Sequence, residues 1–281
     1  MTPKLKILAS SLLLILATAL ALGGCSPASP EKPGVVTSTS LIAQIVERVA
    51  GDRVSVVNII PPAQCPGHFD IKPGDIQKLA NADLFLLHGW QGEQFSQDII
   101  ASADNPNLVT IQMDIQGNWM TPPVQKEATD KITEALCQID SQNTDAYQQM
   151  AAEYSDVISA KEAEIKARLE SANLSAVNVL CADQQAGFVS WLGLNVVAPY
   201  GRPESLTPQI VRELVDTGRA SGVTLVIDNL QSGQDAGAGI AEELGVTRII
   251  LSNFPGGFSD TETWEKAIDK NVQLVLEATG Q

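Results

Sequence analysis

The chain has 281 residues, and its 33 acidic side chains outnumber its 18 Lys and Arg, which gives a formal net charge of −15. An acidic surface of this kind argues against nucleic acid and anionic lipid as partners, and it weakly favours cationic ligands. The length exceeds what one hydrophobic core comfortably fills, so we expect two domains.

The N-terminus has the pattern of a bacterial export signal. Lys4 and Lys6 precede an apolar run of 16 residues, Ile7 to Leu22, which is short for a membrane-spanning helix of about 20. The following Gly-Gly-Cys completes a resemblance to the lipoprotein lipobox. We therefore expect residues 1–24 to be a signal peptide and Cys25 to become the lipid anchor. The alternative is a transmembrane anchor, or a cleaved signal followed by a coincidental cysteine.

Residues 25–33 are rich in Ser, Pro and Glu and predict a flexible tether. Without residues 1–24 the chain loses two cationic and no acidic side chains, so its net charge becomes 16 − 33 = −17. The predicted location is extracytoplasmic, as a bacterial lipoprotein anchored to the cell membrane.

Residues 34–142 alternate strand-like runs with helical patterns. The pattern at 40–51 has apolar residues at helical spacing, and the one at 75–82 begins with Asp75, which can cap a helix. Strands that alternate with helices predict βαβ units and a parallel sheet. The strand-like runs are 34–38, 54–60, 83–88 and 108–113.

Residues 143–171 break this alternation, because they contain no Gly or Pro and are dominated by good helix formers. They predict one helix of roughly 40 Å. A coiled-coil segment is the alternative. Since α/β patterns flank the segment on both sides, a rigid helix that joins two lobes fits better. Its apolar stripe consists of Tyr147, Ala151, Tyr154, Ile158, Ala160, Ile165 and Leu169.

Residues 172–281 return to the alternation, and Thr207-Pro208 has the form of a helix start. The sequence thus predicts an α/β fold of two lobes with parallel sheets, 34–142 and 172–281, joined by one long helix. The strand-like runs of the second lobe are 176–181, 194–200, 223–228 and 247–252, and its helical patterns are 207–222, 237–245 and 261–280.

Residues that bind soft metals gather in the loop PPAQCPGHFDIKP, where Cys65 and His68 lie three positions apart. His88 is the other histidine. It ends the strand-like run 83–88, and ligands of open α/β sheets bind outside the carboxyl ends of strands. We therefore expect His88 on the same side as the loop of His68.

Three cysteines remain besides Cys25, so they cannot all pair with one another. At least one thiol is expected to be free or bound to metal, and a Cys65–Cys181 disulfide is the alternative. Cys137 lies inside a helical pattern and is expected in the core. The large aromatics Trp90, Trp119 and Trp191 either line the cleft between the lobes or pack.

These segments resemble the substrate-binding lipoproteins of bacterial zinc and manganese ABC transporters, the cluster A-I proteins with two α/β lobes and a helical backbone. The resemblance covers residues 35–280 and is densest in GDRVSVVNIIPPAQCPGHFDIKPGDIQKLANADLFLLHG. His68 falls on the family's first ligand position. Later segments that match are NWMTP, ALCQIDSQNTDAYQQMAAEY, FVSWLGLNVV and IAEELGV.

The chain departs from the family at the other ligand positions. Gly117 stands where the resemblance implies a second His, and Asn253 stands where it implies an Asp. Cys181 or Asp183 lies near the third position. The His-rich acidic loop of zinc-specific members is missing from the sequence.

The resemblance therefore implies a metal set of His68, Cys65 and Cys181, with His88 in place of the missing His and Asp183 as a carboxylate. Thiolates and imidazoles suit zinc, copper(I) or iron better than manganese, so zinc is expected first. Residues expected to support the cleft are Asp228, Asn253 and Gly117.

The implied function is a binding protein, not an enzyme. It would capture a transition-metal ion between the lobes and deliver it to a membrane permease driven by a cytoplasmic ATPase. One alternative keeps the scaffold but binds a metal chelate or an organic solute, and another is a non-transporting metal sensor or chaperone. An enzyme with Cys65 as nucleophile and His68 or His88 as base is the third.

Overall fold

The computed structural model describes residues 32–90, 93 and 95–280. The predicted signal peptide (1–24), the lipid-anchor Cys25 and most of the predicted tether (25–33) lie outside these described residues. Residues 33–281 form one compact unit. Within the described part of the chain, no helix is both long and apolar enough to cross a membrane.

The first half of the compact unit is built on a four-stranded parallel sheet of order β2-β1-β3-β4. The central pairing aligns Val36 of β1 with Val57 of β2 and Phe85 of β3. Its strands are β1 (Gly34–Thr37), β2 (Ser55–Asn58), β3 (Leu84–Leu87) and β4 (Val109–Gln112). Its helices are α2 (Ser40–Ala50), α3 (Pro73–Ala80), α4 (Phe95–Ala103) and α5 (Pro122–Ile139).

The second half has a matching parallel sheet of order β6-β5-β7-β8. Thr207 caps α8 as expected, because its side chain accepts a hydrogen bond from the Ile210 amide at 3.3 Å. The strands are β5 (Asn178–Ala182), β6 (Asn195–Tyr200), β7 (Leu225–Asn229) and β8 (Thr247–Leu251). The helices are α7 (Ala186–Trp191), α8 (Pro208–Ser221), α9 (Leu230–Gly233), α10 (Ala238–Leu244) and α11 (Trp264–Thr279).

The predicted fold class is confirmed: two parallel sheets flanked by helices, with one long helix between them in the chain. Each of the eight predicted strand runs overlaps a strand of the structure. The predicted helical patterns do not include α4, α7 and α9, and they mark α5 only around Cys137. With six and four residues, α7 and α9 are too short to show a helical period. Since residues 33–281 hold together as one unit, the lobe limits at 142 and 172 stay predictions.

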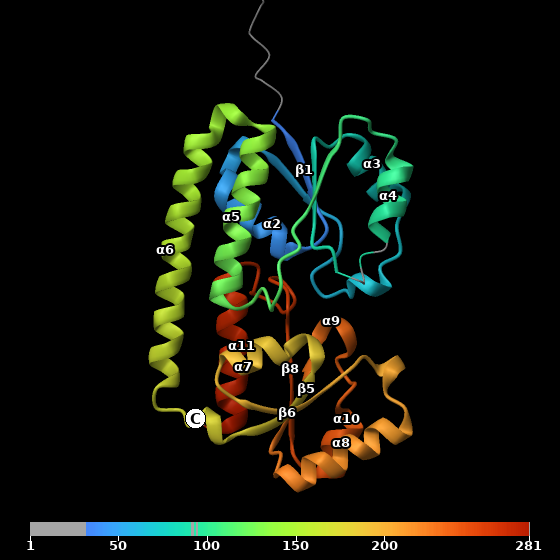
Figure 1. The fold of residues 1–281 in the computed structure, drawn as a ribbon, viewed down its shortest axis with the longest axis vertical. Helices are drawn as coiled ribbons and strands as arrows, with labels where there is room; N and C mark the ends of the chain where they lie inside the picture. The colour runs from blue at the N-terminus through green and yellow to red at the C-terminus, as the bar shows by residue number, and fades with distance from the viewer. Residues whose placement is uncertain (1–31, 91–92, 94, 281) are drawn as a thin grey trace, which may run out of the picture. The chain divides into compact units, whose positions relative to one another are not determined.

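The long helix α6 (Thr144–Leu169) has 26 residues and packs on α2 and α5 of the first half and on α11 of the second (Figure 1). Tyr154 lies in the middle of this contact, where its hydroxyl donates to Gln44 Oε1 at 3.1 Å and accepts from Gln125 Nε2 at 3.0 Å. Five residues of the predicted stripe are buried: Tyr147, Ala151, Tyr154, Ile158 and Ile165.

Ala160 was expected in the stripe and is exposed. The error follows from helix geometry, because Ala160 lies two residues after the buried Ile158 and therefore points to nearly the opposite side of the helix.

The carboxyl ends of the strands matter most for the site. In both sheets the strands are parallel, so the loops that follow them emerge at one edge of each sheet. The residues directly after the strands are therefore the ones expected to surround a ligand.

Because α6 packs on both halves, substitutions at two neighbouring positions of this helix should differ strongly in their effect on the free energy of unfolding. Ile158 is fully buried, whereas Val157 is 41% exposed. Ile158→Ala should lower the free energy of unfolding by about 2–5 kcal/mol, because it leaves a cavity under the helix. Val157→Ala should change it by less than about 0.5 kcal/mol. Urea unfolding of both variants measures the difference, and equal effects would contradict the packing described.

Candidate functional site

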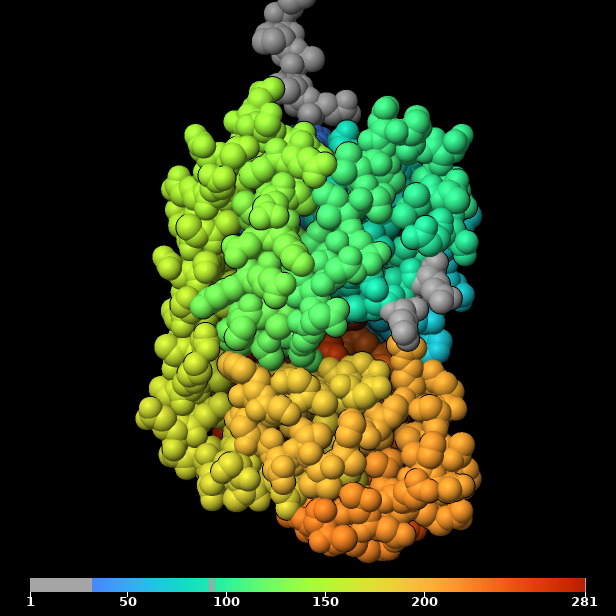
Figure 2. Space-filling view, in the orientation of Figure 1, coloured from blue at the N-terminus to red at the C-terminus, as the bar shows by residue number. Residues whose placement is uncertain are grey.

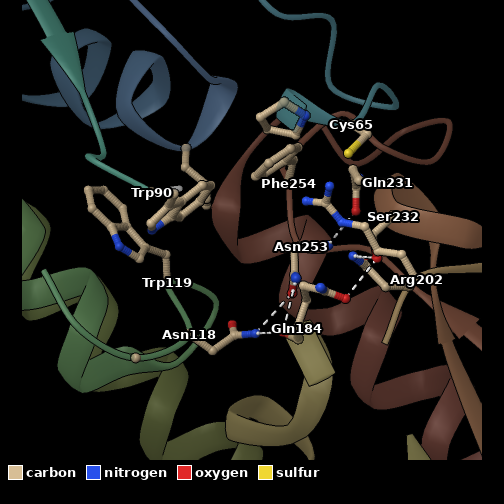
Figure 3. Close-up of a pocket in the computed structure, with 14 residues that line it drawn as sticks. Cys65, Trp90, Asn118, Trp119, Gln184, Arg202, Gln231, Ser232, Asn253 and Phe254 are labelled. Atoms are coloured by element: carbon tan, nitrogen blue, oxygen red, sulfur yellow. Dashed lines mark hydrogen bonds between the residues drawn. The ribbon is translucent and has the colours of Figure 1, made fainter. Parts of the chain in front are cut away.

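A cavity of about 320 Å³ lies between the loops of the two sheets (Figure 3). Figure 2 shows a hollow on the surface where the first half, in green, meets the second half, in yellow and orange. The described residues that line the cavity are Leu41, Cys65, Pro66, Trp90, Gly117, Asn118, Trp119, Gln184, Arg202, Asn229, Gln231, Ser232, Asn253 and Phe254.

Most of the lining comes from positions just after strands. Gln184 and Arg202 each follow their strand by two residues, after β5 and β6, and Asn253 follows β8 by two. Trp90 follows β3 by three residues. Gln231 likewise follows β7 by two residues. The parallel topology thus delivers side chains from five strands of two sheets to one cavity, in agreement with the general rule for open α/β sheets.

Carboxamides join the two halves at the cavity. Asn118 Nδ2, which precedes α5, donates to Asn253 Oδ1 at 2.9 Å and to the backbone oxygen of Gln184 at 2.9 Å. Asn253 Nδ2 donates to the same oxygen at 3.0 Å. Further hydrogen bonds between the halves run from Gln231 Nε2 to Pro62 O (2.9 Å), from Ser40 Oγ to Pro255 O (2.7 Å) and from Trp264 Nε1 to Met120 O (3.2 Å).

Aromatic rings form the other side of the cavity, opposite Arg202 and Ser232 (Figure 3). The Trp90 ring faces Phe254 with an interplanar angle of 8° and 6.2 Å between centroids. On its other face it stacks on His88, with 3.6 Å between centroids. Trp119 meets His88 edge-on at 4.3 Å. Of the three tryptophans considered for the cleft, Trp191 does not line it and packs on Phe188 at 5.9 Å.

His88 supports this aromatic side from behind and does not itself line the cavity. It is 2% exposed, its Nε2 is 2.7 Å from Thr39 Oγ1, and its Nδ1 has no hydrogen-bond partner among the described residues. Burial holds the pKa of His88 well below its ordinary value. The imidazole is therefore neutral, and in this structure its visible role is to fix the plane of Trp90.

Glu93 holds the same loop from the other end. Its carboxylate accepts hydrogen bonds from Ser38 Oγ at 2.6 Å and from the Gly89 amide at 2.7 Å. Burial raises the pKa of Glu93, although these hydrogen bonds act against the rise. The two contacts fix the turn that places His88 and Trp90.

The side chains of Cys65 and His68 point to different places, although both residues belong to one short loop with a 3₁₀ turn at Pro66–His68. The Cys65 side chain is buried and lines the cavity. The His68 side chain is 61% exposed outside it, and its Nε2 lies 3.5 Å from Glu204 Oε1. Because a tight turn sends neighbouring side chains in different directions, the Cys-x-x-His spacing does not make a joint site here.

Cys181 and Asp183 also lie apart from Cys65. Cys181 is fully buried in the central strand β5, where burial, and then the charge of Asp183, raise the pKa of its thiol to about 12. Such a thiol stays protonated and is a poor metal ligand. Asp183 is exposed in a shallower groove outside the cavity. The described cysteines are all free, so the alternative Cys65–Cys181 disulfide is not formed.

Of the three residues expected to support the cleft, two line the cavity and one does not. Gly117 and Asn253 line the cavity, and Gly117 has a φ of 99°, which favours glycine. Asp228 is fully buried away from the lining, where it accepts from Arg248 Nη1 at 2.6 Å and from Tyr200 Oη at 2.7 Å. Its role is to hold β7, not to face a ligand.

The structure therefore does not bring His68, Cys65, Cys181, His88 and Asp183 together. Among the described residues, no three His, Cys, Asp or Glu side chains are placed to hold one metal ion. Cys65 alone of the five lines the cavity. Sequence reasoning missed Arg202, Gln184 and Gln231, and their position just after predicted strands is the signal that could have found them.

The buried, neutral His88 predicts how stability depends on pH. In the unfolded chain this imidazole binds a proton below about pH 6.5, whereas the folded chain binds it only at lower pH. The unfolded state thus binds more protons in that window, so stability falls as the pH drops below about 6.5, by at most about 1.4 kcal/mol per pH unit. The raised pKa of Glu93 has the opposite sign and favours folding at lower pH.

Urea unfolding between about pH 7.5 and 5.5 measures this dependence. His88→Gln, which keeps a donor near Thr39, should flatten the loss of stability below pH 6.5. His68→Gln is the matched control, because His68 is exposed, and it should leave the loss unchanged. An unaltered pH profile in His88→Gln would contradict the burial of a neutral imidazole.

A family model described as zinc-uptake complex component A, periplasmic (ZnuA), matches residues 35–278. The manganese ABC transporter substrate-binding lipoprotein PsaA of Streptococcus pneumoniae is 25% identical over 189 residues, which is 58% of this chain and 61% of PsaA. The matches to the first three curated relatives span between 26% and 61% of their lengths.

Solved structures show the same fold. The substrate-binding protein FpvC of Pseudomonas aeruginosa, in complex with Mn²⁺, has a TM-score of 0.78 at 20% identity, covering 89% of this chain and 99% of FpvC. A crystal structure of ZnuA has a TM-score of 0.75 at 19% identity, covering 89% of this chain and all of that chain (100%). Because the family model matches nearly the whole described body, the chain belongs to the ZnuA family of periplasmic zinc-uptake components, which confirms the resemblance predicted from the sequence.

Proposed function

We propose that this chain is the extracytoplasmic solute-binding component of an ABC importer, and that it binds transition-metal cargo in the cavity between its two halves. The observation that carries the proposal is the cavity itself, where loops from both parallel sheets meet around Trp90, Arg202 and Asn253. Family membership supports a binding component over an enzyme. The partners are then a membrane permease and its ATPase.

Transition-metal cargo is supported by the relatives, whose names state manganese and iron ABC transporters and a zinc-uptake complex. Of the side chains predicted as ligands, Cys65 is the one in the lining, and its sulfur is a soft donor suited to zinc, copper(I) or iron. The thiol gives up its proton when it binds the ion. Anchoring through a lipid on Cys25 remains part of the proposal.

The cargo test uses protein that is loaded by a cell. The full chain is produced in a bacterial host with its own N-terminus, purified without chelators, and analysed for metals and by native mass spectrometry. We expect about one transition-metal ion per chain, and chelation of that ion should lower the melting temperature. At a cargo concentration 100-fold above its Kd the gain in stability is about 2.7 kcal/mol.

Two cysteine variants sharpen this test. Cys65→Ser removes the sulfur in the cavity and should lower the metal content and abolish the melting shift. Cys137→Ser, at a half-buried position against the core, should retain both. Absence of any transition metal from the unaltered protein would overturn the metal part of the proposed function.

A further inference from the structure

The charge of the cavity is unusual for a site that binds a bare cation. Arg202 is the one charged side chain among its described lining residues, and no Asp, Glu or His lines it there. A divalent ion in this space gains the Cys65 sulfur but no carboxylate or imidazole, and it faces a guanidinium, whose repulsion is strong where water is partly excluded. The lining therefore opposes a bare ion.

Arg202 makes no ion pair among the described residues, although four carboxylates line the neighbouring groove that it shares. By contrast, Arg248 is held by Asp228 at 2.6 Å. Its guanidinium lies against Gly67: a Cβ on Gly67 would come within 2.5 Å of Nη1 and 3.2 Å of Cζ. Gly67 thus leaves the space that lets Arg202 reach the cavity from the second half.

The remaining polar groups offer donors more than acceptors. Gln184 Oε1 accepts from Ser232 Oγ at 2.8 Å, and the Gln184 backbone oxygen is already used by Asn118 and Asn253. Gln184 Nε2 makes no hydrogen bond in the described structure. Amide and guanidinium N–H groups are complementary to a ligand that brings carboxylate oxygens.

The other side of the cavity suits a flat ring. Trp90 and Phe254 present nearly parallel faces from the two halves, and Trp90 is fixed from behind by His88. Planar groups pack against such aromatic rings. The volume of about 320 Å³ falls at the small end of the range for organic ligands, about 300–1,000 Å³.

Outside the cavity the charge changes sign. A shallower groove shares Arg202 and Gln184 with the cavity and adds four carboxylates, Asp70, Asp98, Asp183 and Glu204. These carboxylates disfavour a free organic anion on its way in, and Arg202 disfavours a free cation inside. A neutral complex of a divalent metal with an organic dicarboxylate avoids both penalties.

We propose that the cavity takes a transition metal as a compact complex with a planar organic carboxylate, whose carboxylate pairs with Arg202 and whose ring packs against the aromatic side formed by Trp90 and Phe254. The proposal rests on the proposed function and narrows its cargo from a metal ion to a metal complex.

Calorimetric titration of residues 33–281 tests it with four probes: zinc alone, dipicolinate alone, the one-to-one zinc–dipicolinate complex, and zinc–phenanthroline, which is planar but has no carboxylate. We expect the zinc–dipicolinate complex to bind most tightly. Arg202→Gln should weaken it by about 10- to 100-fold, the usual effect of losing a hydrogen bond to a charged group. Arg212→Gln, exposed on α8, is the matched control and should leave binding unchanged.

Gly67→Ala gives a second, independent variant, because its methyl group must displace the Arg202 guanidinium. It should weaken the same complex without removing any charge. Folding of each variant is checked by its melting temperature without ligand.

Every other pattern overturns the inference. Zinc alone binding as tightly as the complex, with no effect of Arg202→Gln, would leave the proposed function standing with a bare ion as cargo. Dipicolinate alone binding as tightly as its zinc complex would remove the metal from the proposed function as well. Tightest binding of zinc–phenanthroline would exclude recognition of a carboxylate. If no probe binds, the inference fails, and the metal content of cell-loaded protein decides the proposed function separately.

Discussion

The site depends on one constraint, the parallel direction of all strands in each sheet. Since parallel strands end at a common edge, β3, β5, β6, β7 and β8 send the residues that follow them, among them Trp90, Gln184 and Arg202, toward one cavity. The long helix α6 contacts helices of both halves and keeps the two edges together. Amide hydrogen bonds from Asn118 then close the junction beside the cavity.

The cavity differs in chemistry from a site that surrounds an ion with charged ligands. Where the resemblance implied His and Asp, the chain has Gly117 and Asn253. The side-chain amide of Asn253 is engaged in hydrogen bonds with Asn118 and with the backbone oxygen of Gln184, at the junction of the two halves. Arg202 is the charged side chain of the described lining, and Trp90 and Phe254 supply its aromatic side. Both features favour a ligand that brings its own anionic oxygens and a flat apolar body.

Much of the fold was predictable, because short runs such as VTLVID have the composition of buried strands and the stretch 143–171 has that of a single helix. The site was less so. His68 matches a family ligand position, yet its side chain is exposed, because the direction of a side chain in a tight turn is set by backbone angles that one sequence does not reveal. Cys181 was weighed as a ligand, but in a central strand its thiol is buried and protonated. Arg202 was not singled out from the sequence. Only the structure shows that its guanidinium lies against Gly67, where a Cβ would collide with it.

The most direct test of this account is a crystal structure of residues 33–281 grown with zinc and dipicolinate, with anomalous diffraction recorded at the zinc edge. The account predicts a zinc peak inside the cavity, with planar organic density between Arg202 and Trp90. A zinc peak coordinated by protein side chains alone, with no organic density in the cavity, would contradict it.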